Sequence, residues 1–267
     1  MKRLLLMTIF AALAAGTLRA QERMTVPFAN NTQPRKLVVD SMLGSVTVRG
    51  YEGQEVIIET SGGGSRSPRR NRSEPPAGMH RIGPESGDIQ VSQENNTVRI
   101  NGGIFSGGKN LTVQVPTQTS VNVKTLSGRE LLIENVSGEI EANNMNGQVN
   151  ILNVSGSVVA HSMNGKVTAS LNTVMPDKVM SFSTFNGDVD VTLPAAIKAN
   201  VKMKTDRGDM FTDFDIQLAP SGPPVTERGR NNSYRIRSDR TTTGSINGGG
   251  AEIQFTSFNG DIVIHKK

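Results

Sequence analysis

The sequence predicts an all-β protein, a flattened β-solenoid with coils of about 18–22 residues and two short strands in each coil. Two phrases recur at a fixed interval of eighteen positions: NVSG at 135–138 and again at 153–156, and MNG at 145–147 and again at 163–165. The glycines that end these phrases follow one another at every ninth position. A nine-residue unit that is doubled in this way is typical of a stacked solenoid, in which a short strand and a corner occur twice in each coil.

A hydrophobic register before nine glycines supports this fold class. The positions seven, five and two residues before each glycine hold 26 hydrophobic residues among 27, whereas a composition of 35% hydrophobic residues gives about nine by chance. Positions −7 and −5 share one face of a strand, because side chains alternate with a period of two. We expect a turn after position −5, so that position −2 also points inward; Asp206 is the one polar residue at that position. The nine glycines are Gly53, Gly128, Gly138, Gly147, Gly156, Gly165, Gly187, Gly208 and Gly260.

Asparagine and glycine are predicted to form the corners between strands, because both residues tolerate the positive φ of a tight turn. One coil separates Asn135 from Asn153 and Asn146 from Asn164, so we expect each pair to stack and to form hydrogen bonds along the axis. A ligand site made by these asparagines is the alternative. The predicted corner residues are Asn135, Gly138, Asn146, Gly147, Asn153, Gly156, Asn164, Gly165, Asn186, Gly187, Asn259 and Gly260.

Residues 1–20 have the pattern of a secretory signal peptide. Lys2 and Arg3 precede an apolar run at residues 4–15, and Ala20 is a small residue at the expected cleavage point. An N-terminal membrane anchor is the alternative, but this run of twelve residues is short of the roughly 20 that span a bilayer. We therefore expect an exported protein of the periplasm, the cell surface or the medium, with no transmembrane segment after cleavage.

The remainder is predicted to be one β-solenoid domain with two excursions. Residues 21–60 are expected to supply N-terminal strands that cap the solenoid, and residues 88–267 its body, in one domain with residues 37–60. Residues 61–87 are rich in Gly, Ser, Pro and Arg and are predicted to be a disordered loop. Residues 216–232 are expected to form a second loop. FSTFNGDVDV (182–191) matches FTSFNGDIVI (255–264), and the lysines that follow are expected to discourage end-to-end stacking of an open coil.

Composition excludes several classes of protein. The chain has no cysteine, so disulfides, zinc–thiolate sites and a lipoprotein anchor are excluded. Removal of Lys2, Arg3 and Arg19 with the signal peptide, and of no acidic residue, lowers the formal net charge from +5 to +2. The remaining basic cluster lies in one loop without aromatic residues, so nucleic acid is not expected as a partner.

Two groups of residues are candidates for a site on the surface. Asp206 breaks the hydrophobic register and could pair with Asp209 for acid–base work or metal binding; the alternative is a flared corner where the side chain reaches water. Asp88, Asp188, Asp209 and Asp261 each follow a glycine, which favours hydrogen bonds to corner backbone. The second group is an arginine cluster that could dock an acidic protein or an anionic lipid: Arg66, Arg69, Arg70 and Arg72.

No catalytic, cofactor-binding or metal-binding residue is predicted, and no cofactor. His80, His161 and His265 lack the spacing of metal ligands. The glycine-rich pieces at residues 102–108 and 246–250 lack a following helix and lysine, so they are predicted to be turns and not phosphate loops.

The chain resembles the bacterial β-strand-repeat proteins of unknown function that are labelled putative adhesins and are related to the auto-transporter adhesin head domain. The resemblance covers roughly residues 37–267. It rests on the signal peptide, VPTQTSVNVKTLSG, the NVSG and MNG coils, and the FNGDV and FNGDI strands. It implies a secreted or cell-envelope β-solenoid and supplies no catalytic residues.

Three functions follow as hypotheses. The favoured one is an exported, non-enzymatic module that binds a protein or glycan of the cell envelope or serves as a scaffold there. The second is an envelope polysaccharide-active enzyme that uses Asp206 and Asp209. The third is a periplasmic partner of a signalling or stress-response system that docks through the arginine cluster.

Overall fold

The computed structural model describes residues 22–30, 33–61, 89–102, 110–220, 225–228, 234–237 and 241–267. The predicted signal peptide and all but the first residue of the predicted loop at 61–87 lie outside these residues. The described residues form strands and turns without a helix, which confirms the all-β class. Accordingly, the part of the chain that the structure describes has no helix long and apolar enough to cross a membrane.

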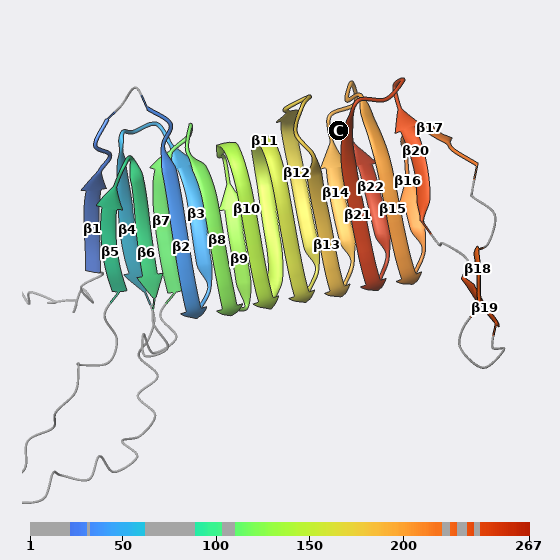
Figure 1. The fold of residues 1–267 in the computed structure, drawn as a ribbon. Coiled ribbons are helices and arrows are strands. Elements are labelled where there is room, and N and C mark those ends of the chain that lie inside the picture. Colours follow the sequence, from blue (N-terminus) through green and yellow to red (C-terminus); the bar gives the residue numbers. More distant parts are fainter. Residues whose placement is uncertain are drawn as a thin grey trace, which may run out of the picture.

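Twenty strands form one sheet that folds into two layers around a hydrophobic core (Figure 1). In the order of its hydrogen-bonded neighbours, the front layer consists of β5 (Ile89–Glu94), β6 (Thr97–Gly102), β2 (Lys36–Leu43), β8 (Ser120–Ser127), β10 (Ser137–Asn146), β11 (Gln148–Asn164), β13 (Met180–Asn186), β21 (Ala251–Asn259), β15 (Ala199–Arg207), β20 (Thr242–Ile246) and β17 (Ile216–Leu218). The back layer consists of β1 (Glu22–Pro27), β4 (Glu55–Ser61), β7 (Asn110–Pro116), β3 (Val46–Tyr51), β9 (Glu130–Glu134), the start of β11, β12 (Val167–Val174), β14 (Val189–Leu193), β22 (Ile262–Lys266) and β16 (Met210–Thr212).

In the middle of the front layer, parallel neighbours are separated by about one length of the sequence repeat. Between the parallel strands β10 and β11, Ser137 pairs with Ser155, which lies one eighteen-residue period later in the chain. Between β11 and β13 the offset grows to twenty-two positions, because Val159 pairs with Ser181. We call one front-layer strand and the back-layer strand that follows it a level of the stack.

The order of the levels departs from the order of the sequence at both ends of the chain. The β2–β3 level lies between β6–β7 and β8–β9, with parallel partners on both sides. The β21–β22 level lies likewise between β13–β14 and β15–β16. Two expectations are therefore corrected: residues 36–51 do not cap the stack, and the C-terminal strand does not end it. Only β1 and β4, from the predicted cap, lie at the end of the back layer.

Side-chain packing explains the position of the β21–β22 level. The matching segments 182–191 and 255–264 lie side by side, so that like side chains stack. The rings of Phe182 and Phe255 are stacked at a centroid distance of 5.6 Å, and those of Phe185 and Phe258 at 4.7 Å. Each of these phenylalanines thereby contacts a side chain of the same shape in the next level.

The glycine-rich turn at residues 247–250 brings β21 past β15. Asn247, Gly248 and Gly249 all have positive φ, and Asn247 donates a hydrogen bond of 2.7 Å to the carbonyl of Ile197. A Cβ at Gly250 would lie 2.2 Å from the carbonyl oxygen of Lys198, so only glycine allows this close crossing. The turn predicted there is structural.

The core follows the predicted register at positions −7 and −5 and departs from it at position −2. All eighteen residues at −7 and −5 are buried. At −2, Val136 and Val154 are buried, because Asn135 and Asn153 adopt φ of 57° and 54° and turn the chain before them. In β10 and β13 the strand continues to the residue before glycine, so Met145 and Phe185 point outward. The inward prediction for position −2 is therefore wrong wherever the turn comes at the glycine itself.

The predicted loop at residues 216–232 is also corrected in part. Ile216–Leu218 forms β17, because its backbone pairs with the edge of β20. β18 (Val225–Arg228) pairs with β19 (Tyr234–Arg237) as a separate two-stranded antiparallel sheet.

Candidate binding surface on the front layer

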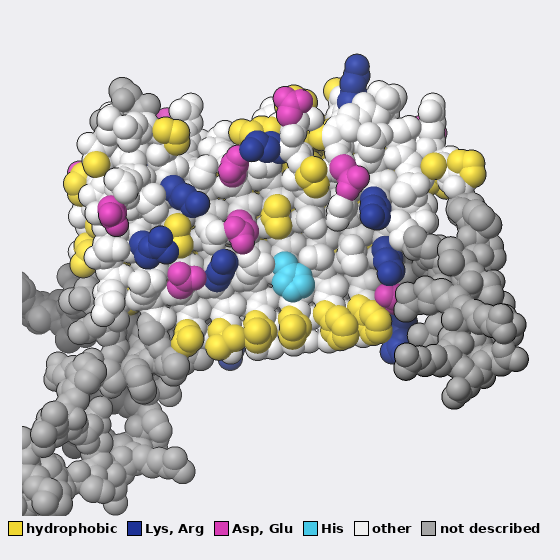
Figure 2. Space-filling model, in the orientation of Figure 1, with side chains coloured by type: hydrophobic (Ala, Val, Ile, Leu, Met, Phe, Trp, Pro, Cys, Tyr) yellow, Lys and Arg dark blue, Asp and Glu magenta, His cyan; other side chains and the backbone are white. Residues whose placement is uncertain are grey.

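An aligned row of apolar side chains reaches the surface along one edge of the front layer (Figure 2). Neighbouring strands place one such residue at each of six successive levels, because their parallel registers align these positions. We call this row the ridge. It consists of Met42, Leu126, Met145, Met163, Phe185 and Phe258. The exposed fraction reaches 44% at Met163 and 48% at Phe185, which is high for large apolar side chains in such an ordered array.

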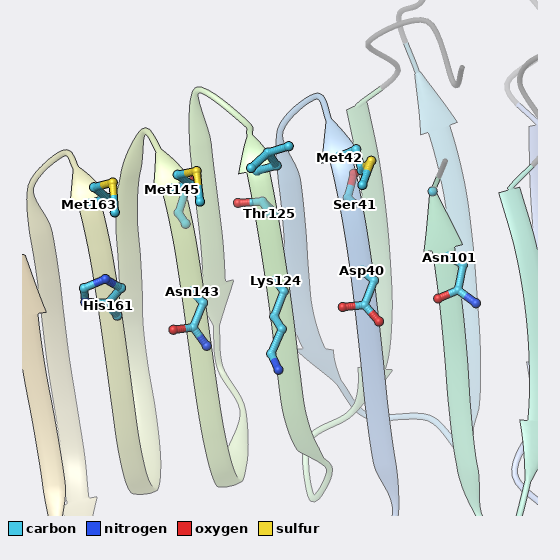
Figure 3. Close-up of a pocket in the computed structure, with 13 residues that line it drawn as sticks. Asp40, Ser41, Met42, Asn101, Lys124, Thr125, Asn143, Met145, His161 and Met163 are labelled. Carbon is cyan, nitrogen blue, oxygen red and sulfur yellow. The ribbon is translucent and has the colours of Figure 1, made fainter. Parts of the chain in front are cut away.

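A groove of about 460 Å³ runs beside the ridge on β6, β2, β8, β10 and β11. Figure 3 shows its two rows, with Met42, Met145 and Met163 near the corner and a polar row farther along the strands. The polar row consists of Asn101, Asp40, Lys124, Asn143 and His161. A groove with an apolar wall and a few aligned polar groups has the chemistry of a binding site for a partner that is itself amphipathic.

Charges in the polar row are available for a partner. Asp40 and Lys124 lie opposite each other on β2 and β8, but within the described residues neither side chain has an ion pair or a hydrogen bond. His161 is held by Ser183, whose Oγ lies 2.9 Å from its Nδ1. The imidazole therefore has a fixed position at the end of the groove.

A second groove of about 450 Å³ lies on the same face, nearer the other ends of the strands. It contains Glu139, which forms an ion pair of 2.9 Å with Lys178, and Glu141, which accepts a hydrogen bond from Asn122. Val159, exposed to 43%, lies on β11 at its edge. We call the outward surface of the front layer the front face. It carries two grooves, one beside the ridge and one nearer the other ends of the strands.

Buried hydroxyl groups fix the backbone beneath the ridge. Ser162 Oγ donates a hydrogen bond of 2.9 Å to the carbonyl of Gly147, and Thr184 Oγ1 one of 2.8 Å to that of Gly165. Ser257 makes the same bond to Gly187, at 3.0 Å. Sequence reasoning missed these residues, although each lies three positions before a corner glycine. They lock neighbouring corners together, so the ridge is held on a rigid edge.

An asparagine ladder runs along the same corner. Asn164 Nδ2 donates to Asn146 Oδ1 at 3.0 Å, and Asn186 Nδ2 donates to Asn164 Oδ1 at 2.7 Å. Asn259 Nδ2 continues the ladder to Asn186 Oδ1 at 2.7 Å. Because these amides bond to one another, they link the corners of neighbouring levels.

The structure places Asp206 and Asp209 in different surroundings. Asp206 lies half-exposed on β15, beside Phe258 of the neighbouring strand β21, and so continues the ridge at its end. Asp209 directly precedes β16, and its backbone N–H donates to Asp261 Oδ1 at 2.8 Å. Asp261 N–H donates in turn to Asp188 Oδ1 at 3.0 Å. Asp188 and Asp261 therefore carry the predicted corner role.

Other candidates are placed as follows. Arg66, Arg69, Arg70 and Arg72 lie outside the described residues, as does His80. His265 lies on the back layer, with Nε2 3.4 Å from Asp190 Oδ1, and Lys166 pairs with the same carboxylate at 2.7 Å. These are exposed pairs, which contribute little to stability. Among the described residues, no three His, Cys, Asp or Glu side chains are grouped closely enough to hold a metal ion.

No protein-family model and no curated protein matches the chain. Solved structures that are similar to it include the following two. One is described as a "putative cell adhesion protein" from Clostridium sporogenes, with 13% identity, a TM-score of 0.45, and coverage of 93% of this chain and 100% of that one. The other is a "putative adhesin" from Bacteroides fragilis, with 10% identity, a TM-score of 0.38, and coverage of 93% and 98%. At this identity and TM-score, neither likeness assigns a function to this chain.

Proposed function

We propose that this chain is an exported, non-enzymatic module of the cell envelope with an adhesin-like role, which binds an envelope protein or glycan through its front face. Its architecture in this proposal is a flattened β-solenoid with two strands in each coil and coils of about 18–22 residues. The parallel pairs Ser137 with Ser155 and Val159 with Ser181, whose offsets equal the shortest and the longest of these coils, support that architecture.

The observation that carries the binding function is the ridge with its groove. Six large apolar side chains form one continuous row, and a monomer rarely exposes contiguous apolar surface unless a partner covers it. The buried hydroxyls and the asparagine ladder hold the backbone beneath this row rigid, so little backbone freedom is lost on binding.

The positions of the carboxylates favour binding over catalysis. Asp188 and Asp261 accept backbone hydrogen bonds at corners, and Asp190 pairs with Lys166. Asp206 lies on β15 of the front layer, whereas Asp209 directly precedes β16 of the back layer. Three of the carboxylates that could serve a glycan-active enzyme are thus engaged in bonds within the sheet.

The test is co-sedimentation of residues 21–267 with purified cell-envelope fragments. We expect retention of the wild type without release of soluble glycan. Met145→Lys should weaken retention about tenfold or more, because a charge replaces the centre of the apolar row. Phe211→Lys is the matched control, since Phe211 is an exposed apolar residue of β16 on the back layer.

Two outcomes count against this function. Equal retention of Met145→Lys and wild type would contradict the assignment to the front face. Release of soluble glycan that is abolished by Asp206→Asn would establish the enzyme instead.

A further inference from the structure

The front face is arranged symmetrically about β11. Nine of its strands follow in the order β6, β2, β8, β10, β11, β13, β21, β15 and β20, so β11 has four neighbours on either side. A twofold axis parallel to the strands and through β11 would lay this face on the same face of a second copy, with the two stacks antiparallel. β2 of one copy would then oppose β15 of the other, β8 would oppose β21, and β10 would oppose β13.

This arrangement brings apolar side chains together. Met163 and Val159, both exposed on β11, would meet their own equivalents on the axis. On either side, Met145 would meet Phe185 of the second copy, and Leu126 would meet Phe258. Methionine packs favourably on aromatic rings because its thioether is flexible and polarizable. Only at the outermost level does an apolar residue of the ridge, Met42, oppose a charged one, Asp206.

Charges select the antiparallel arrangement. Asp40 on β2 and Lys204 on β15 have no ion pair within the described part of the chain, and the axis places each opposite the other. Lys124 would face Thr256 and His161 would face its own equivalent, so no Lys, Arg, Asp or Glu of the polar row meets a like charge. In a parallel arrangement of the two stacks, the twofold axis would run along the polar row, across the strands. Each strand would then lie on the same strand of the second copy. Asp40 would then lie on Asp40 and Lys124 on Lys124, which costs affinity.

The area is close to what a stable dimer needs. Nine strands at a spacing of about 4.8 Å span about 38 Å, and six residues along each strand cover about 20 Å. The product is roughly 750 Å² of flat area in each copy, compared with about 800 Å² for each partner of a standard interface.

We propose that the partner of the front face is a second copy of this chain, bound as an antiparallel dimer about a twofold axis through β11. The proposal rests on the proposed function, because it names the partner of the same surface. Binding by this module would then be self-association.

Single cysteines test the geometry, because the natural chain contains none. We expect purified residues 21–267 to sediment as a dimer. Met163→Cys should be linked into a dimer by a short bis-maleimide reagent, because position 163 lies on the axis and sheets that pack face to face are only about 10 Å apart. Met42→Cys on the same ridge should not, since its two copies lie about six strand spacings, or about 29 Å, apart. Phe211→Cys on the back layer controls for random collisions.

A charge swap tests the register. Asp40→Lys and Lys204→Asp should each weaken the dimer about tenfold or more, and the double variant should restore affinity close to that of the wild type. Thermal melting near that of the wild type would show that each variant is folded. These substitutions are on the surface, so we expect their melting temperatures to change little.

Each contrary outcome overturns a stated part of the proposal. A wild-type monomer at micromolar concentration, with Met163→Cys cross-linking no more than Phe211→Cys, overturns the dimer. If Met145→Lys still loses envelope retention in that case, the proposed function stands with a foreign partner. Strong cross-linking of Met42→Cys, or a double variant as weak as the single ones, overturns the antiparallel register. If the dimer forms and envelope fragments retain Met145→Lys as well as the wild type, the proposed function alone is contradicted.

Discussion

Ile151→Asp is expected to lower the free energy of unfolding by at least about 4 kcal/mol, because it removes a buried apolar side chain and leaves an unpaired carboxylate in the core. Ile151 is fully buried on β11, in register with Ile133 on one side and Ala169 on the other. Neither neighbour offers a hydrogen-bond donor in its side chain. Urea denaturation followed by circular dichroism measures the change as a lower midpoint or an unfolded chain.

Ile151→Val is the matched control for this substitution. It keeps the site apolar and should cost about 0.5–1.5 kcal/mol, because only one methylene is lost. An unfolding midpoint of Ile151→Asp equal to that of the wild type would mean that the side chain faces solvent, and the hydrophobic register would be wrong.

Deletion of residues 251–267 is expected to unfold the C-terminal levels of the stack and to abolish most of the stability. Among the described strands, β16 pairs with β22 alone, and β15 would lose its parallel partner. Four fully buried apolar side chains leave with the segment: Ile253, Phe255, Ile262 and Ile264. At about 1.5–3 kcal/mol each, their loss removes roughly 6–12 kcal/mol, which is comparable to the whole stability of a domain.

Limited proteolysis measures this effect. We expect rapid cleavage of the truncated chain between residues 194 and 220, where the full-length chain resists. Deletion of residues 265–267 is the control, because it removes three exposed side chains and no buried one. Equal resistance of the 251–267 deletion and the full-length chain would show that the last segment is peripheral.

The sequence predicts the core because the alternation of side chains along a strand and the nine-residue repeat together determine which residues point inward, for example Val149 and Ile151. The sequence does not predict the ridge, because position −2 holds an apolar residue both where the side chain is buried and where it is exposed. Val154 turns inward since Asn153 adopts a left-handed conformation, and Met145 points outward since its strand continues to the glycine. The residue at position −3 carries the distinction: asparagine with positive φ before Val136 and Val154, and a buried Ser, Thr or Asn under the ridge.

The order of the levels is also hard to predict from the repeat. Every level presents a similar pair of apolar rows, so each could pack on any other, and proximity in the sequence favours consecutive stacking. Long-range identity gives the better signal, since the near-identical segments at 182–191 and 255–264 are neighbours in space. The symmetry of charges about β11 depends on the spatial order of the levels. β2, from near the N-terminus, and β21, from near the C-terminus, both lie between other strands of the front face.

The most direct test of the strand order in the front layer is the intramolecular disulfide that forms between paired cysteines on neighbouring strands. Ser183 pairs with Thr256 on the neighbouring strand, and Thr256 pairs with Lys204 on the next, so Ser183 and Lys204 are two strand spacings, or about 9.6 Å, apart. Ser183→Cys combined with Thr256→Cys should oxidise to a disulfide within the monomer, since adjacent Cα atoms lie within about 4.4–6.8 Å. Ser183→Cys combined with Lys204→Cys should remain reduced. A disulfide in the second pair and none in the first would show consecutive stacking, and the front face described here would not exist.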